Sequence, residues 1–241
     1  MRYPVVLFDV GETLIGPGDS FGAIYAAVAG ELGLTLDPER AERCLRQVWR
    51  EMQEEIPPGT DRYSHYPGGE DEYWSRFSRR TLEQAGGMPL DDPTARIALE
   101  RIRKAFRDEA AWEIYPDVRP TLESLVEQGT RLGIVSNWDS RLPSLLQMLD
   151  LARYFEVIGV SHFERVEKPN PEFFHRVLAR MQTRPDQALH IGDVPELDLA
   201  GARAAGVDGL LVDRRGTPEL GALTDLTDVP RIARNGDRAG G

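Results

Sequence analysis

The sequence is almost free of cysteine, with Cys44 alone among 241 residues. No disulfide can form within the chain, which is typical of proteins from a reducing compartment. Long hydrophobic runs are also missing. The N-terminal apolar run, Val5 to Phe8, is far too short for a signal peptide, and no stretch approaches the roughly 20 apolar residues that a membrane span needs. We therefore expect a cytoplasmic protein with no membrane partner.

Basic residues are in the minority. Lys and Arg number 29 against 40 Asp and Glu, which gives a formal net charge of −11 at pH 7. Such an acidic surface argues against nucleic acid as a partner, because nucleic-acid binding requires a basic footprint. An anionic ligand would therefore need a local cationic group, such as a metal ion, a lysine or a helix N-terminus.

Apolar residues are present in an ordinary share, 41%, and the length suits one large domain or two small ones. Short segments rich in Val, Ile or Leu are typical of buried strands. They are Pro4–Asp9, Arg131–Ser136, Phe155–Val160, Ala188–Gly192 and Asp208–Val212. Helical stretches separate the last four, with end signals at Asp117, at Asn170 followed by Pro171, and at Gly206. This alternation predicts an α/β fold with a doubly wound parallel sheet of five or more strands.

Between Leu14 and Tyr115 the alternation stops, and no segment there has the pattern of a strand. Four segments have helical character, and residues 56–69 form a loop between two of them. The four are Phe21–Leu32, Pro38–Glu54, Glu70–Ala85 and Thr94–Trp112. We interpret the region as an inserted helical module. The predicted organisation is a core domain over residues 1–15 and 115–228, an inserted helical domain over 16–114, and a flexible tail over 229–241.

Polar residues follow four of the predicted strands. Because ligands of open α/β sheets bind outside the carboxyl ends of the strands, these residues mark a candidate site. In chain order they are Asp9, Ser136 with Asn137, Lys168, and Asp193 followed by Asp198. Taken singly, each has an ordinary explanation as a turn, a helix cap or a solvated side chain. Their combination favours a functional site, whereas we interpret Cys44, His65, His162 and Trp138 as structural.

The set is coherent for phosphoryl transfer. Asp9 can act as a nucleophile, and Asp9 with Asp193 offers hard oxygen ligands for Mg²⁺. Ser136 and the backbone N–H groups after Asp9 can donate hydrogen bonds to a phosphoryl oxygen. Lys168 supplies positive charge beside the aspartates, which would otherwise repel one another and raise their pKa values. A small phosphorylated molecule is therefore the expected ligand.

Four motifs carry a family resemblance: DVGETL (Asp9–Leu14), SN (Ser136–Asn137), KPNPEFF (Lys168–Phe174) and GDVPELD (Gly192–Asp198). Together they resemble the haloacid dehalogenase-like hydrolase superfamily, over about residues 3–212. The inserted helices look like the helical C1-type cap of that family. The resemblance implies a hydrolase in which Asp9 attacks phosphorus and forms an aspartyl-phosphate, while the cap opens and closes over the site.

The resemblance also implies roles for individual residues. The predicted catalytic residues are Asp9, Ser136 and Lys168. Phosphate would be bound by Gly11, Glu12, Ser136, Asn137 and Lys168. Mg²⁺ would be held by Asp9, the carbonyl of Gly11, Asp193 and Asp198, with Asp198 orienting Lys168 or a metal-bound water. Cap residues would choose the substrate, and we look for them in the segment 61–72 and in the loop just after Leu14. The oligomeric state is left open between monomer and homodimer.

Position 11 departs from the family pattern. Phosphatases of the superfamily carry a second Asp two residues after the nucleophile, which serves as general acid and base, and here that residue is Gly11. Such proton transfer typically accelerates a reaction about 10²–10⁴-fold. Three consequences are possible. The leaving group departs without a proton, another group such as Glu12 supplies the proton, or the protein binds its ligand with very weak turnover. Within the superfamily, a small residue at this position makes the chain resemble the haloacid-dehalogenase-like domain-containing protein 3 group.

The sequence leaves four functions to be weighed. A Mg²⁺-dependent phosphohydrolase is favoured by Asp193 and Asp198. A weakly active or inactive ligand-binding protein on the same fold is kept open by Gly11. A metal-free haloacid dehalogenase is disfavoured, because those relatives place a bulky Tyr at position 11 and lack the acidic pair. A phosphonatase is weaker still, since no cap lysine suits a Schiff base.

Overall fold

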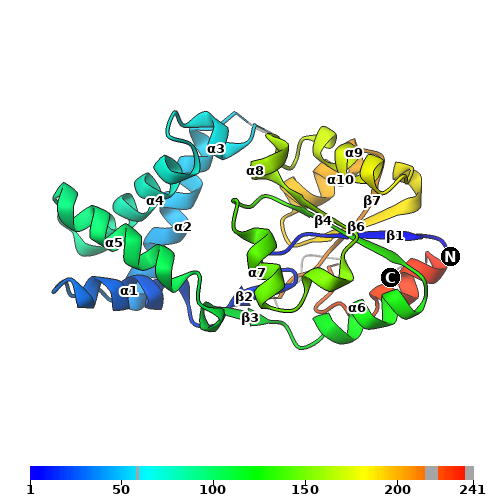
Figure 1. Ribbon diagram of the computed structural model, residues 1–241, viewed down its shortest axis with the longest axis horizontal. Coiled ribbons are helices and arrows are strands. Elements are labelled where there is room, and N and C mark those ends of the chain that lie inside the picture. The colour runs from blue at the N-terminus through cyan, green and yellow to red at the C-terminus, as the bar shows by residue number, and fades with distance from the viewer. Residues whose placement is uncertain (58–59, 215–221, 237–241) are drawn as a thin grey trace. The chain divides into compact units, whose positions relative to one another are not determined.

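The computed structural model describes residues 1–57, 60–214 and 222–236. The chain divides into two compact units. The first consists of Met1–Gly16, Pro58–Asp61 and Ile114–Gly241, and the second of Pro17–Pro57 and Arg62–Glu113 (Figure 1). Pro58 and Gly59, part of the predicted loop, lie outside the described residues. Among those described, no helix is both long and apolar enough to cross a membrane.

A parallel sheet forms the centre of the first unit. Its strands are β1 (Val5–Phe8), β4 (Arg131–Ser136), β5 (Val157–Val160), β6 (Ala188–Gly192) and β7 (Asp208–Leu211), in the order β5-β4-β1-β6-β7. The predicted doubly wound α/β sheet is confirmed, and the strands lie within two residues of their predicted bounds. Since β4 and β5 lie on one side of β1 and β6 and β7 on the other, the strand order reverses at β1, where such sheets bind ligands.

Helices cover both faces of this sheet, and all four residues of β1 are therefore buried. The helices of this unit are α6 (Val118–Glu127), α7 (Leu142–Met148), α8 (Ser161–Glu164), α9 (Pro171–Arg180), α10 (Ala200–Ala204) and α11 (Val229–Asn235), with the short turns η2 (Ala152–Tyr154), η3 (Pro185–Gln187) and η4 (Pro195–Leu199). Figure 1 shows α9 and α10 on one face and α6 and α11 on the other. Asn170 caps α9 by accepting from the Glu172 N–H, and Gly206 follows α10 with a φ of 76°, as the sequence predicts.

The second unit is helical and has its own apolar core. It contains α1 (Phe21–Glu31), α2 (Pro38–Glu54), α3 (Arg62–His65), α4 (Gly69–Gly86), α5 (Asp92–Ala105) and the turn η1 (Glu109–Ala111). Asp37 and Asp91 cap α2 and α5 and are each followed by a proline at the start of the helix or one residue later. Tyr73 is fully buried at the centre of an aromatic cluster that includes Tyr63 and Phe77.

Several local predictions are wrong. The region between Leu14 and Tyr115 does hold strands, because β2 (Ile15–Pro17) and β3 (Trp112–Ile114) pair with each other. With three residues each, they are too short to show a periodic pattern. The fourth predicted helix ends at Ala105 rather than Trp112, since Asp108 caps a separate turn. The loop 56–69 contains α3, and Asp117 makes no side-chain cap for α6.

The predicted tail is also wrong over residues 229–235, which form α11. Val229, Ile232 and Ala233 are buried, so this apparently polar end contributes to the core. The Tyr3 N–H donates to the carbonyl of Ala233, and the Arg2 N–H to that of Arg234. Residues 237–241 lie outside the described residues.

Candidate active site

The sheet register brings the predicted residues to one level. Phe8 pairs with Ile134 on one side and Ile191 on the other. Asp9, the next residue of the chain, is therefore level with Val135 and Gly192. Ser136, which is buried, and Asp193 each lie one residue further along their own strands. Three strand ends thus deliver an aspartate, a serine and a second aspartate to the same edge.

Lys168 lies between two of the aspartates. Its Nζ is 2.8 Å from Asp9 Oδ1 and 2.6 Å from Asp198 Oδ1, and its side chain is only 2% exposed. Burial by itself would lower the pKa of Lys168, but the charges of Asp198 and Asp9 raise it to about 12. The lysine is therefore a permanent cation, and it fixes the orientation of the Asp9 carboxylate.

Asn137 sets the place of this lysine. Its Oδ1 accepts from the Lys168 N–H at 2.8 Å, and its Nδ2 donates to the Lys168 carbonyl at 3.0 Å. The sequence predicts that Asn137 binds phosphate. In the structure its side-chain amide holds the Lys168 backbone against the end of β4. Phosphate binding by Asn137 stays a prediction.

Asp198 is engaged on both carboxylate oxygens. Oδ1 accepts from Lys168 and from His190 Nε2, the latter at 2.8 Å, and Oδ2 accepts from the Val194 N–H at 2.9 Å. Burial would raise the pKa of Asp198, but Lys168 and His190 hold it well below its usual range. A Cβ on Gly192 would lie 2.1 Å from Asp198 Cγ, so this close approach requires a glycine. Asp198 therefore binds the Lys168 ammonium through a carboxylate that is itself held by His190 and Val194.

His190 is a site residue that sequence reasoning missed. It lies within β6 and is fully buried, and its Nδ1 has no hydrogen-bond partner among the described residues. The one available signal is a histidine inside the apolar segment Ala188–Gly192, two residues before the glycine. A single buried histidine carries little information without the position of its partner.

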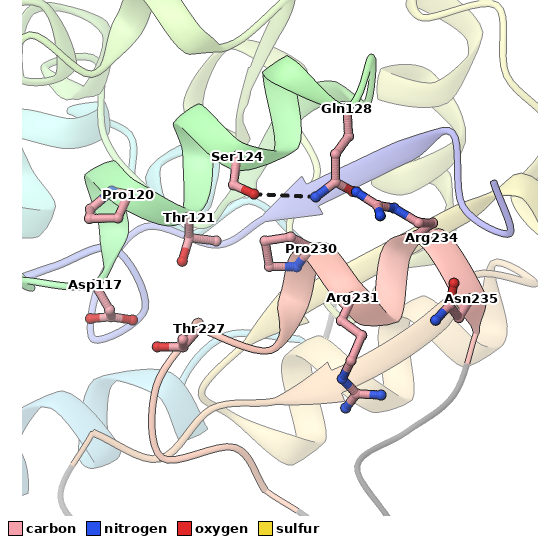
Figure 2. A pocket seen from close by; sticks show the side chains of 10 residues that line it. All are labelled: Asp117, Pro120, Thr121, Ser124, Gln128, Thr227, Pro230, Arg231, Arg234 and Asn235. Atoms are coloured by element: carbon pink, nitrogen blue, oxygen red, sulfur yellow. Dashed lines mark hydrogen bonds between the residues drawn. The ribbon is translucent and has the colours of Figure 1, made fainter.

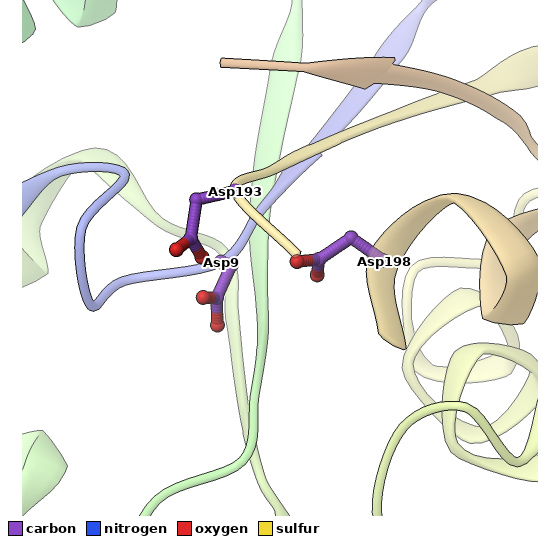
Figure 3. Close-up of side chains that lie close together, drawn as sticks. All are labelled: Asp9, Asp193 and Asp198. Atoms are coloured by element: carbon purple, nitrogen blue, oxygen red, sulfur yellow. The ribbon is translucent and has the colours of Figure 1, made fainter. Parts of the chain in front are cut away.

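Asp193 completes an acidic cluster with Asp9 and Asp198, in which one ligand atom from each lies within 4.8 Å of the others (Figure 3). Burial, followed by the charges of Asp9 and Asp198, raises the pKa of Asp193 to about 8. Three carboxylates thus share one lysine. Oxygen donors with an excess of negative charge suit a hard divalent cation, which would relieve their repulsion.

A second network holds the loop that follows Asp9. Tyr115 donates its hydroxyl to Glu12 Oε2 at 3.2 Å, and the Arg214 guanidinium stacks on the Tyr115 ring at 4.4 Å. Burial and the Glu12 charge raise the pKa of Tyr115. Arg214 also donates to the Thr13 carbonyl at 2.7 Å and pairs with Asp117 at 2.7 Å. Sequence reasoning missed Tyr115, Asp117 and Arg214 as parts of the site, because they are far from the loop in sequence.

A hollow of about 550 Å³ lies elsewhere, between α6 and α11 (Figure 2). It is lined by Asp117, Pro120, Thr121, Ser124, Gln128, Thr227, Pro230, Arg231, Arg234 and Asn235. None of these residues belongs to the acidic cluster. Of the residues interpreted as structural, Cys44 and His65 belong to the second unit, and Trp138 lies against Gly11.

The protein has a parallel sheet with an aspartate at the end of its central strand, a buried lysine and a further acidic pair. These features define a class of hydrolases that are built on an open α/β sheet. Within that class, the chain belongs to the haloacid dehalogenase-like hydrolases, whose family model matches residues 3–206. The predicted membership is confirmed.

The chain is 31% identical over 249 residues to haloacid dehalogenase-like hydrolase domain-containing protein 3 of Danio rerio, with 98% of this chain and 100% of the relative covered. It is 30% identical to the ribulose-1,5-bisphosphate 5-phosphatase of Halopiger xanaduensis over 97% of this chain and 93% of the relative. The structure resembles a magnesium-bound putative HAD-hydrolase, YfnB of Bacillus subtilis, with a TM-score of 0.74, 20% identity, and 97% and 100% of the two chains covered. That last likeness concerns the fold.

Proposed function

We propose that this protein is a Mg²⁺-dependent phosphohydrolase that acts on a small phosphorylated metabolite through an aspartyl-phosphate at Asp9. The observation that carries the proposal is the position of the Lys168 ammonium between Asp9 and Asp198. A cation held there offsets the charge of a phosphoryl group that approaches a carboxylate. Relatives named ribulose-1,5-bisphosphate 5-phosphatase and phosphoserine phosphatase support the same chemistry.

In the proposed reaction an Asp9 carboxylate oxygen attacks phosphorus, and the bond from phosphorus to the leaving oxygen breaks. The electron pair departs with the leaving oxygen. Water then attacks the phosphorus of the aspartyl-phosphate, the bond to Asp9 breaks, and inorganic phosphate and the free carboxylate result. Lys168 keeps Asp9 oriented through both steps, and Ser136 donates a hydrogen bond to a phosphoryl oxygen.

The donor set fits a magnesium ion. Asp9, Asp193 and the carbonyl of Gly11 would hold it, with Asp198 beside them as the partner of Lys168. When bound, Mg²⁺ would neutralise phosphoryl charge and the repulsion between Asp9 and Asp193. The helical unit would act as the cap that excludes water and selects the substrate.

Two alternative functions are weighed against the phosphohydrolase. Gly11 keeps open a ligand-binding protein with weak turnover, because the usual acid and base is absent. A metal-free dehalogenase is disfavoured by the excess of carboxylate in the cluster of Asp9, Asp193 and Asp198.

The deciding experiment is an assay of the purified protein against aryl, sugar, nucleotide and acyl phosphates, with Mg²⁺ and with chelator. We expect Mg²⁺-dependent turnover that Asp9→Asn abolishes and that the exposed control Asp186→Asn, on η3, retains. If nothing turns over while Mg²⁺ with a phosphate analogue still raises the Tm, the ligand-binding function replaces the phosphohydrolase. Metal-independent release of halide from a haloacid would instead establish a dehalogenase.

A further inference from the structure

The loop after β1 carries a glycine and a glutamate at unexpected positions. Glu12 has a φ of 53°, in the left-handed region that favours glycine. Gly11, one residue earlier, does not have a positive φ. The backbone therefore explains neither the glycine at position 11 nor the glutamate at position 12, and the reason for Gly11 must lie in its surroundings.

The indole ring of Trp138 provides that reason. A Cβ on Gly11 would lie 3.2 Å from Trp138 Cζ3 and 4.0 Å from Cη2. Such a contact is tighter than an ordinary van der Waals contact. A side chain at position 11 would therefore require the Trp138 ring to shift by a few tenths of an ångström or more.

The backbone of Trp138 is held in place from α8. Its N–H donates to Ser161 Oγ at 3.2 Å, and its carbonyl accepts from the Ser161 hydroxyl at 3.2 Å and from the His162 N–H at 3.3 Å. Because these contacts fix the Trp138 backbone, the indole ring can move only by rotation about the side-chain torsion angles. Glu12, the neighbouring carboxylate, is directed to Tyr115 instead.

We propose that Trp138 is a specificity-determining residue, whose ring disfavours a proton-donating side chain at position 11. The inference rests on the proposed phosphohydrolase function. The enzyme then takes phosphorylated compounds whose leaving oxygen is weakly basic, as in acyl and aryl phosphates. In that reaction the leaving oxygen keeps the electron pair of the broken bond and departs as a carboxylate or phenolate, without a proton. The proton of the attacking water leaves with the phosphate.

The test is a double-mutant cycle of Gly11→Asp and Trp138→Ala. The first readout is the ratio of kcat/KM for 4-nitrophenyl phosphate to that for methyl phosphate, with Mg²⁺. We expect Gly11→Asp alone to leave this ratio high, because Trp138 keeps the carboxyl group out of position. The double variant should lower the ratio at least about tenfold, a fraction of the roughly 10²–10⁴-fold that a positioned acid catalyst supplies.

The second readout is the Tm, which needs no turnover. Gly11→Ala should lower the Tm when Trp138 is present and much less in the Trp138→Ala background, whereas Trp49→Ala in the other unit should show no such coupling. If Gly11→Asp alone lowers the ratio, or the two changes are additive in both readouts, the inference is wrong while the phosphohydrolase stands. If the wild type turns over no phosphate compound, both fail, and Tm coupling then reports only the packing of Trp138 on Gly11.

Discussion

The side-chain amide of Asn137 binds Lys168 at both of its backbone hydrogen-bonding groups, the N–H and the carbonyl. The two residues are 31 positions apart in the chain. Since the Lys168 side chain in turn holds Asp9, the end of β4 controls the orientation of the candidate nucleophile. The strand that supplies Ser136 thus also positions the cation.

Asn137→Ala should remove both bonds and leave the Lys168 backbone groups without these partners. We expect a loss of about 1–3 kcal/mol in the free energy of unfolding, measured by denaturant titration. Turnover should fall further than stability alone explains, because Lys168 would no longer be fixed beside Asp9. The exposed Gln147→Ala on α7 should change neither quantity. Unchanged turnover in Asn137→Ala would contradict the positioning role.

Asp193 should make the metal-free protein less stable as the pH rises. Its pKa is raised to about 8 in the folded state, so the folded state retains a proton that the unfolded chain loses near pH 4. The stabilisation is complete below pH 4 and is lost as the pH rises through 8. In the presence of chelator, Asp193→Asn should therefore raise the Tm at pH 8 and flatten its pH dependence between pH 5 and 8. Asp19→Asn is the exposed control, and added Mg²⁺ should raise the Tm of the wild type at pH 8 but not that of Asp193→Asn.

His190→Leu should take away one of the donors that surround the buried Asp198 carboxylate. A hydrogen bond to a charged group contributes about 1.5–3 kcal/mol, and a loss of that size in unfolding free energy is expected. Turnover should fall as well, since Asp198 holds Lys168. His190→Gln, which keeps a donor, should recover part of both losses. His175→Gln, on the exposed side of α9, is the control. Equal stability and activity in His190→Leu would mean that the histidine only fills space.

Arg214→Met should break the ion pair with Asp117, whose two side chains are 6% and 14% exposed. Removing one partner of such a pair costs about 3–5 kcal/mol, because the remaining charge stays buried. The double change Arg214→Met with Asp117→Asn should recover part of this loss. Arg231→Met, whose partner is the exposed Asp228, should leave the Tm nearly unchanged. If Arg214→Met proves as mild as this control, Arg214 does not hold the loop after Asp9.

The sequence predicts the sheet well and the contacts within the site poorly. Apolar runs such as Val5–Phe8 mark strands locally, and the strand ends then place Asp9, Ser136 and Asp193 together by topology alone. Pairings such as His190 with Asp198 depend on side-chain directions in the packed structure and leave no periodic signal in the chain. The ion pair of Arg214 and Asp117 joins positions 97 residues apart, so no local pattern announces it.

The helix α11 has a consequence for the other end of the molecule. The hydrogen bonds from the N–H groups of Arg2 and Tyr3 to its carbonyls attach it to the segment that runs directly into β1. A chain shortened after Asp228 would lose this attachment and would expose the apolar surface of α6 that α11 covers. The strand that carries Asp9 would then be anchored by its neighbours in the sheet but not at its start. Helix α11 thus stabilises the chain segment before β1, at the end of the strand opposite Asp9, although it contributes no atom to the proposed chemistry.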